Sequence, residues 1–186
     1  MKEVCVIGLG YIGLPTAAML ASHGIQVTGV DVVPDIVDTI NRGEVHFQEP
    51  GLEELVKKVV LEGKLKVSLQ VEASEAFIIA VPTPITEEKK ADLSHVKEAA
   101  RQIYPVLKKG NLVMLESTVP PKTTEEVLVP ILEESGLQAG VDFYVAHCPE
   151  RVLPGRILYE LEYNNKVIGG INRLSAEMAR DLYQVF

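Results

Sequence analysis

The 186-residue sequence contains no tryptophan, only two cysteines, and no uninterrupted apolar run of the about 20 residues that a membrane-spanning helix needs. It is also short of positive charge: 18 Lys and Arg residues face 26 Asp and Glu residues, for a formal net charge of -8 at pH 7. Because no basic stripe gathers to neutralise phosphates, nucleic-acid binding is not expected. The first residues lack the basic and then apolar segments of a secretory signal, so we expect a cytoplasmic protein without membrane contact.

The few residues of types that bind metals or form disulfides are dispersed. Cys5 and Cys148 lie far apart, which does not make a disulfide framework and fits a reducing compartment. Neither cysteine has a partner at metal-ligand spacing, and the histidines are scattered at positions 23, 46, 95 and 147. We therefore expect no metal site.

The remaining composition is that of a globular protein, with 47% apolar and 24% charged residues. Its length suffices for one hydrophobic core, or for one domain with an extension. Strands are predicted at 4–7, 25–30, 64–69, 76–81, 111–115, 143–146 and 166–171, and helices at 14–21, 35–42, 52–60, 93–107, 125–134 and 173–186. This alternation predicts a doubly wound α/β fold, a parallel sheet with helices on both faces and right-handed crossovers.

A glycine-rich segment, GLGYIG at 8–13, follows the first predicted strand and opens into the apolar run 14–21. The order predicts a strand that ends at Gly8, a tight turn and a helix. Gly10 lacks a Cβ, so a pyrophosphate could approach main-chain N–H groups there, while Gly13 lets the helix lie close against the strand. The free N–H groups at the helix start favour a bound phosphate.

The second predicted strand ends at Asp31. Dinucleotide-binding units place an acidic residue about 20 residues beyond the glycine motif, where it accepts hydrogen bonds from the adenosine ribose. Residues 32–35 (VVPD) supply no Arg or Lys for a 2′-phosphate, so the pattern favours NAD over NADP. A plain βαβ unit with a surface Asp is the alternative.

Three later predicted strands end in polar or proline-rich segments, namely PTP at 82–84, EST at 116–118 and HCPER at 147–151. Ligands of doubly wound sheets bind at the carboxyl ends of the strands. Thr83 is therefore a candidate cofactor contact, although a simple proline-rich turn would also explain it.

Five motifs, in order, resemble those of the UDP-sugar 6-dehydrogenases, the family of the UDP-glucose and UDP-N-acetylmannosamine dehydrogenases. They are GLGYIGLP at 8–15, INRG at 40–43 with EPGL at 49–52, VPTP at 81–84, ESTVPPKTT at 116–124 and PERVLPG at 149–155. The last motif is similar to the N-acetylmannosamine branch, because UDP-glucose dehydrogenases usually read Pro-Glu-Phe-Leu-Arg-Glu-Gly there. Arg151 replaces the Phe and Pro154 the second Glu, so a role of that carboxylate does not carry over.

The resemblance implies an NAD-dependent oxidation of the C6 alcohol of a UDP-sugar, through an aldehyde, to a carboxylate with two NAD. The glycine motif and the residues implied to contact NAD are Gly8, Gly10, Tyr11, Ile12, Gly13, Asp31, Thr83 and Thr118. Arg151, Val152 and Leu153 are implied to line the UDP-sugar site. Thr118 is also implied to place the hydrolytic water, and Glu150 to act beside the chemistry as a base or by orienting water. The alternative is that Glu150 merely caps or pairs with Arg151.

The catalytic cysteine and lysine of this family belong to motifs beyond the nucleotide-binding domain, and neither motif occurs in residues 1–186. Cys5, inside a predicted strand, is expected to be buried and inert. Cys148 lies at a strand end beside Glu150, and we expect a structural role for it, with a reactive thiol as the alternative.

We therefore expect residues 1–186 to be the NAD-binding part of a longer enzyme, with 1–31 as the first βαβ unit and 142–186 as an extension that carries part of the sugar-nucleotide site. The central helix and the C-terminal domain are expected to lie outside this chain, and the full-length parent to be a homodimer or higher oligomer. Alone, these residues should bind NAD weakly and oxidise no sugar.

Two other interpretations stay open at this point. β-Hydroxyacid dehydrogenases share a Gly-Leu-Gly loop, but they usually have Asn-Arg-Thr for NADP after the second strand, where this chain has DVV at 31–33. A free-standing module that senses NAD or a nucleotide sugar is the non-enzymatic alternative, although sensing alone would not require the motifs at the strand ends.

Overall fold

The computed structural model describes residues 1–149 and 151–186. Its strands are β1 (Glu3–Ile7), β2 (Gln26–Val30), β3 (Leu65–Ser68), β4 (Ala76–Ile79), β5 (Leu112–Leu115), β6 (Tyr144–His147) and β7 (Gly169–Gly170). Its helices are α1 (Gly13–Ser22), α2 (Pro34–Asn41), α3 (Leu52–Leu61), α4 (Ser94–Ile103), α5 (Val129–Glu133), α6 (Ile157–Tyr163) and α7 (Arg173–Tyr183).

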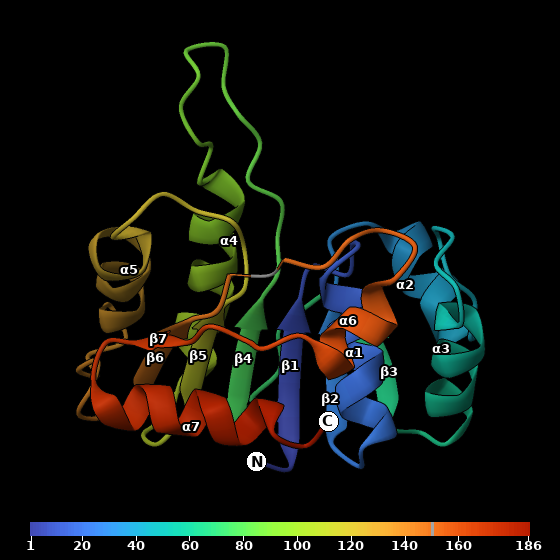
Figure 1. The fold of residues 1–186 in the computed structure, drawn as a ribbon. Helices are drawn as coiled ribbons and strands as arrows, with labels where there is room; N and C mark the ends of the chain where they lie inside the picture. Colours follow the sequence, from blue (N-terminus) through green and yellow to red (C-terminus); the bar gives the residue numbers. More distant parts are fainter. Residues whose placement is uncertain (150) are drawn as a thin grey trace.

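The strands form one sheet in the order β3-β2-β1-β4-β5-β6-β7 (Figure 1). β1 lies inside the sheet and pairs in parallel with β2 on one side and β4 on the other. The chain therefore builds the sheet outward in one direction and then in the other, and the order reverses between β1 and β4. The predicted doubly wound α/β fold is confirmed.

Successive side chains of β1 point to opposite faces of the sheet, and each face has its own core. Val4 and Val6 pack with residues of α1, α2, α3 and α7. Cys5 and Ile7 pack with residues of α4 and α5. Both faces are thus covered by helices, which is why β4 is apolar at every position and fully buried.

Two predicted helices are interrupted at prolines. α4 ends at Ile103, and a short 3₁₀ turn, Tyr104–Val106, contains Pro105. The predicted helix at 125–134 begins as a π-helical segment, Thr124–Leu128, before α5, at a junction where Pro130 supplies no N–H.

The prediction for the last strand is wrong in its length and direction. β7 contains only Gly169–Gly170 and pairs antiparallel with β6, so the sheet is parallel except at this edge. The cause is α6, which was not predicted and which packs on α1 through Ile157, Leu161 and Met19. The chain leaves β6, crosses to the other half of the sheet and returns to the edge from the opposite direction (Figure 1).

Between β4 and α4 the chain forms a hairpin at 84–92 that projects past α4 (Figure 1). Ile85 pairs with Ala91, and the N–H of Thr86 donates to the carbonyl of Lys90 at 2.8 Å. Its tip, EEKK at 87–90, is exposed, as the charge pattern predicts. Among the described residues, no helix is long and apolar enough to cross a membrane.

Candidate functional site

The strand register brings the carboxyl ends of β2, β1, β4, β5 and β6 to one level. Ile7 pairs with Val30 and with Ile79. Ile79 pairs with Leu115, which pairs with His147. The residues that follow these five positions are Gly8, Asp31, Ala80, Glu116 and Cys148. Most of the residues singled out in the sequence thus meet at one edge of the sheet.

Each of the three glycines in the GLGYIG segment between β1 and α1 is glycine for a different physical reason. Gly8 has φ +88°, and a Cβ there would lie 2.7 Å from the carbonyl oxygen of Ala80. A Cβ on Gly13 would lie 1.8 Å from the carbonyl oxygen of Gly8. A Cβ on Gly10 would meet no described atom within 4 Å. The fold therefore requires Gly8 and Gly13, whereas the space above Gly10 is open to a ligand.

The same loop presents backbone donors at the start of α1. The N–H of Leu14 donates to the carbonyl of Gly10 at 3.1 Å and begins the helical pattern. The N–H groups of Gly10, Tyr11 and Ile12 find no acceptor within residues 1–149 and 151–186. Such donors, together with the positive end of the helix dipole, suit a phosphate group.

Asp31 is fixed at the end of β2 by two backbone donors. Its Oδ2 accepts from the N–H of Leu9 at 3.0 Å, and its Oδ1 accepts from the N–H of Val33 at 3.1 Å. A carboxylate oxygen accepts more than one hydrogen bond, so both oxygens can also accept from ribose hydroxyls. The bond to Leu9 fixes the carboxylate relative to the glycine loop.

The loops after β4 and β5 are tied to each other by side-chain hydroxyls. The Oγ1 of Thr83 donates to the carbonyl oxygen of Thr118 at 2.6 Å, and the Oγ of Ser117 donates to the carbonyl oxygen of Val81 at 2.7 Å. The Thr83 oxygen keeps lone pairs for a further donor, and Thr118 is exposed.

These groups surround one cleft of about 580 Å³, at the point where the strand order reverses. The residues predicted to contact NAD that line it are Gly8, Gly10, Tyr11, Ile12, Asp31, Thr83 and Thr118. Gly13 is buried behind the loop, where it permits the close packing described above. No Lys or Arg occurs among the described residues of this lining, so nothing there would pair with a 2′-phosphate.

The loop between α2 and α3 places two aromatic residues beside the cleft, and the sequence patterns did not assign them. The ring of Phe47 packs against that of Tyr11 at a tilt of 38°, with centroids 4.4 Å apart, and the ring of His46 meets that of Phe47 edge-on, with centroids 4.9 Å apart. His46 also lines the cleft. Burial lowers the pKa of His46, and the negative charge of Asp31 acts in the opposite direction. The available signal was two adjacent aromatic side chains in an otherwise polar loop.

Residues 2–186 match the UDP-glucose/GDP-mannose dehydrogenase family, NAD binding domain. The chain belongs to this family. The predicted resemblance and the NAD cofactor class are thereby confirmed, and the interpretation as a β-hydroxyacid dehydrogenase domain is set aside.

Named relatives agree with this result. The UDP-N-acetyl-D-mannosamine dehydrogenase of Methanococcus maripaludis is 51% identical over 190 residues, which is 100% of this chain and 43% of the relative. The solved UDP-N-acetyl-mannosamine dehydrogenase of Staphylococcus aureus has a TM-score of 0.96 and 47% identity, covering 99% of this chain and 44% of that chain. The GDP-mannose dehydrogenase of Pseudomonas aeruginosa has a TM-score of 0.93 and 30% identity, with the same coverage. This chain thus spans less than half the length of these relatives.

In this member of the dehydrogenase family a buried charged cluster stands beside the cleft, at the end of β5. Glu116 lines the cleft, and its Oε1 accepts from the hydroxyl of Tyr183 at 2.7 Å and lies 3.2 Å from the Nζ of Lys166. The ammonium of Lys166 also lies 4.4 Å from the centre of the Tyr183 ring. The cluster joins β5 to α7 and to the segment before β7.

The residues expected to contact the sugar nucleotide do not line the same cleft. Arg151, Val152 and Leu153 lie in the segment between β6 and α6. The Nη2 of Arg151 donates to the carbonyl oxygen of Asn165 at 2.7 Å. Leu153 is exposed, and Val152 packs on the small cluster that joins α6 to α1. Glu150 lies outside the described residues.

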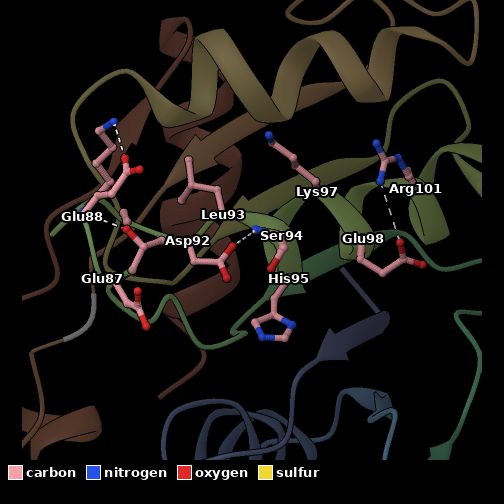
Figure 2. A pocket seen from close by; sticks show the side chains of 12 residues that line it. Glu87, Glu88, Asp92, Leu93, Ser94, His95, Lys97, Glu98 and Arg101 are labelled. Atoms are coloured by element: carbon pink, nitrogen blue, oxygen red, sulfur yellow. Dashed lines mark hydrogen bonds and ion pairs between the residues drawn. The ribbon is translucent and has the colours of Figure 1, made fainter.

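A second hollow, of about 940 Å³, lies between the 84–92 hairpin and α4 (Figure 2). It is larger than the cleft, but its lining is mostly charged and exposed. Asp92 accepts from the N–H of Ser94 at 2.9 Å, Arg101 pairs with Glu98 at 4.0 Å, and Lys97 is exposed (Figure 2). Solvated side chains thus line this hollow, and the glycine loop contributes nothing to it.

The two cysteines are both buried. Burial raises the pKa of the Cys5 thiol to about 12, which fits the predicted inert residue in β1. No group of three or more His, Cys, Asp or Glu side chains that could hold a metal ion occurs in the described part of the chain.

Proposed function

We propose that this chain holds NAD in the cleft at the β1–β4 switch point and serves as the cofactor-binding part of an enzyme that oxidises the C6 alcohol of a UDP-sugar, of the UDP-N-acetylmannosamine class, to the uronic acid. The observation that carries the proposal is the juxtaposition, in one cleft, of open space above Gly10 and the fixed carboxylate of Asp31. The relatives named as UDP-N-acetylmannosamine dehydrogenases support the substrate class.

The residues present fit such a cofactor. The N–H groups of Gly10, Tyr11 and Ile12 would donate to the diphosphate, and Asp31 would accept from the adenosine ribose. Thr83 and Thr118, on the far side of the switch point, would contact the nicotinamide half. When bound, NAD accepts the hydride that leaves the sugar C6, and two NAD are needed for the alcohol to reach the carboxylate.

On the substrate side, the extension 142–186 would carry part of the sugar-nucleotide site. Arg151, Val152 and Leu153 would contact the UDP-sugar from the segment between β6 and α6. Glu150 would act as a base or orient water, and Thr118 would help to place that water. The remaining catalytic groups would come from outside residues 1–186.

Calorimetric titration of the intact protein with NAD, NADP and UDP-N-acetylmannosamine tests this function. We expect NAD to bind, NADP to bind at least about tenfold more weakly because Asp31 would face the 2′-phosphate without a cation, and the UDP-sugar to bind separately. Turnover should release two NADH for each uronic acid formed.

Equal or tighter NADP binding would contradict the assignment of Asp31. Binding of NAD without binding or turnover of any UDP-sugar would favour the sensing module over the dehydrogenase.

A further inference from the structure

A buried carboxylate connects two segments that lie more than a hundred residues apart in the sequence. Glu49, in the loop between α2 and α3, is only 7% exposed. Its Oε2 accepts from the N–H of Gly155 at 2.7 Å, and its Oε1 accepts from the N–H of Ile157 at 2.8 Å. Both oxygens are thus engaged by the segment that leads from β6 into α6, and hydrogen bonds to a charged acceptor are the stronger kind.

A second carboxylate bonds to the same segment at another backbone N–H. Glu160, on α6, is 8% exposed, and its Oε2 accepts from the N–H of Leu153 at 2.9 Å. Next to Glu49, Gly51 also approaches this region, since a Cβ there would lie 3.5 Å from a methyl carbon of Leu158. We call residues 151–156 the substrate loop; two buried carboxylates fix its backbone.

The substrate loop presents two exposed side chains, although its backbone is fixed. Arg151 and Leu153 are exposed, and Leu153 has 61% of its surface in solvent. A fixed backbone that presents exposed side chains is the usual arrangement of a binding loop on a rigid scaffold.

The other end of the Glu49 segment touches the glycine loop, because the ring of Phe47 packs against that of Tyr11. One short stretch, 47–51, therefore contacts both the glycine loop and the substrate loop. A simple connection between α2 and α3 would not require a buried carboxylate that bonds to a loop distant in the sequence.

We propose that Glu49 is a positioning residue for the sugar nucleotide: it holds the substrate loop in its binding conformation through the N–H groups of Gly155 and Ile157. This inference rests on the proposed function, which assigns that loop to the UDP-sugar.

The test compares Glu49→Gln with Glu53→Gln in the intact protein. The Gln amide keeps the size of the side chain but turns an NH₂ group toward a backbone N–H, while Glu53 is an exposed residue in the first turn of α3. We expect Glu49→Gln to raise the Kd for UDP-N-acetylmannosamine at least tenfold and the Kd for NAD less than twofold, and to speed hydrogen exchange of the Gly155 and Ile157 amides. Glu53→Gln should change none of these.

Glu160→Gln, which weakens the bond to the N–H of Leu153, should likewise raise the Kd for the UDP-sugar, and it replaces Glu49→Gln in the test if that variant does not fold. Faster exchange with unchanged UDP-sugar affinity would overturn the positioning role and leave the proposed function intact. An equal loss of NAD and UDP-sugar affinity would show a general structural role and also overturn it. If the unsubstituted protein binds NAD but no UDP-sugar, the proposed function fails, and the inference falls with it.

Discussion

Gly10 and Gly13 lie three residues apart, and the lack of a side chain serves a different purpose at each. A Cβ on Gly13 would collide with the carbonyl oxygen of Gly8 at 1.8 Å, whereas a Cβ on Gly10 would enter open space. We expect Gly13→Ala to lower the free energy of unfolding by about 3 kcal/mol or more, because backbone must shift. Gly10→Ala should leave that energy within about 0.5 kcal/mol and weaken NAD binding at least about tenfold.

Chemical denaturation and calorimetry on the two variants separate these effects. Normal NAD affinity in a stable Gly10→Ala variant would show that the space above Gly10 is not used by the cofactor. Full stability of Gly13→Ala would show that the turn is less closely packed than the structure indicates.

The carboxylate of Asp31 is held at the end of β2 by the N–H groups of Leu9 and Val33. Replacement by Ala removes a charged acceptor for the ribose hydroxyls and also frees the N–H of Leu9, so we expect NAD binding to weaken by about 1 to 3 kcal/mol. Isothermal titration measures the change, with Asp35→Ala, an exposed residue in the first turn of α2, as the matched control. A dissociation constant that does not change would remove Asp31 from the site.

Site residues could be predicted from the sequence where the chemistry depends on local spacing. The glycines and Asp31 follow from a strand, a turn and a helix in order, with an acidic residue at the next strand end. Phe47 and Glu49 could not be predicted in this way, because their partners, Tyr11 and Gly155, lie far away in the sequence. Only folding shows that they meet.

At the scale of elements, α6 illustrates the same limit. Its buried residues Ile157, Glu160 and Leu161 have helical spacing, but its first residues carry no local side-chain cap. The N–H of Ile157 is satisfied by Glu49 from another part of the chain. Since α6 was not predicted, the crossover that reverses the direction of β7 could not be predicted either.

The contact between the rings of Phe47 and Tyr11 links the loop before α3 to the loop before α1. Aromatic pairs contribute about 0.5 to 1.5 kcal/mol beyond their buried area, so Phe47→Ala should loosen the glycine loop and weaken NAD binding roughly two- to tenfold. Phe47→Tyr preserves the ring and should bind NAD as the unsubstituted protein does. If both variants bind NAD as tightly as the unsubstituted protein does, the contact between the two rings does not support the glycine loop.

For the whole molecule, the sheet separates two cores and leaves its carboxyl edge uncovered by either helix layer. The doubly wound, mostly parallel character of the sheet followed from the alternation of strands and helices, because sequential parallel strands with right-handed crossovers allow few arrangements. Strands β4, β5 and β6 were predicted as well, but α6 and the antiparallel β7 were not, since they depend on contacts between distant segments. The cleft lies at the ends of strands that the sequence predicts, away from β7.

Because the cleft joins β1, β2, β4 and β5, a ligand bound there should stabilise the fold as a unit. At an NAD concentration a hundredfold above its Kd, binding to the native state alone adds about 2.7 kcal/mol. For a chain of this size that corresponds to a rise in Tm of roughly 5 to 11 °C. Differential scanning fluorimetry with NAD, and with NADP at the same concentration, measures it. Gly10→Ala, which keeps the fold, should lose about half of the shift or more, since tenfold weaker binding leaves about 1.4 kcal/mol; an equal shift in that variant would place the cofactor elsewhere on the molecule.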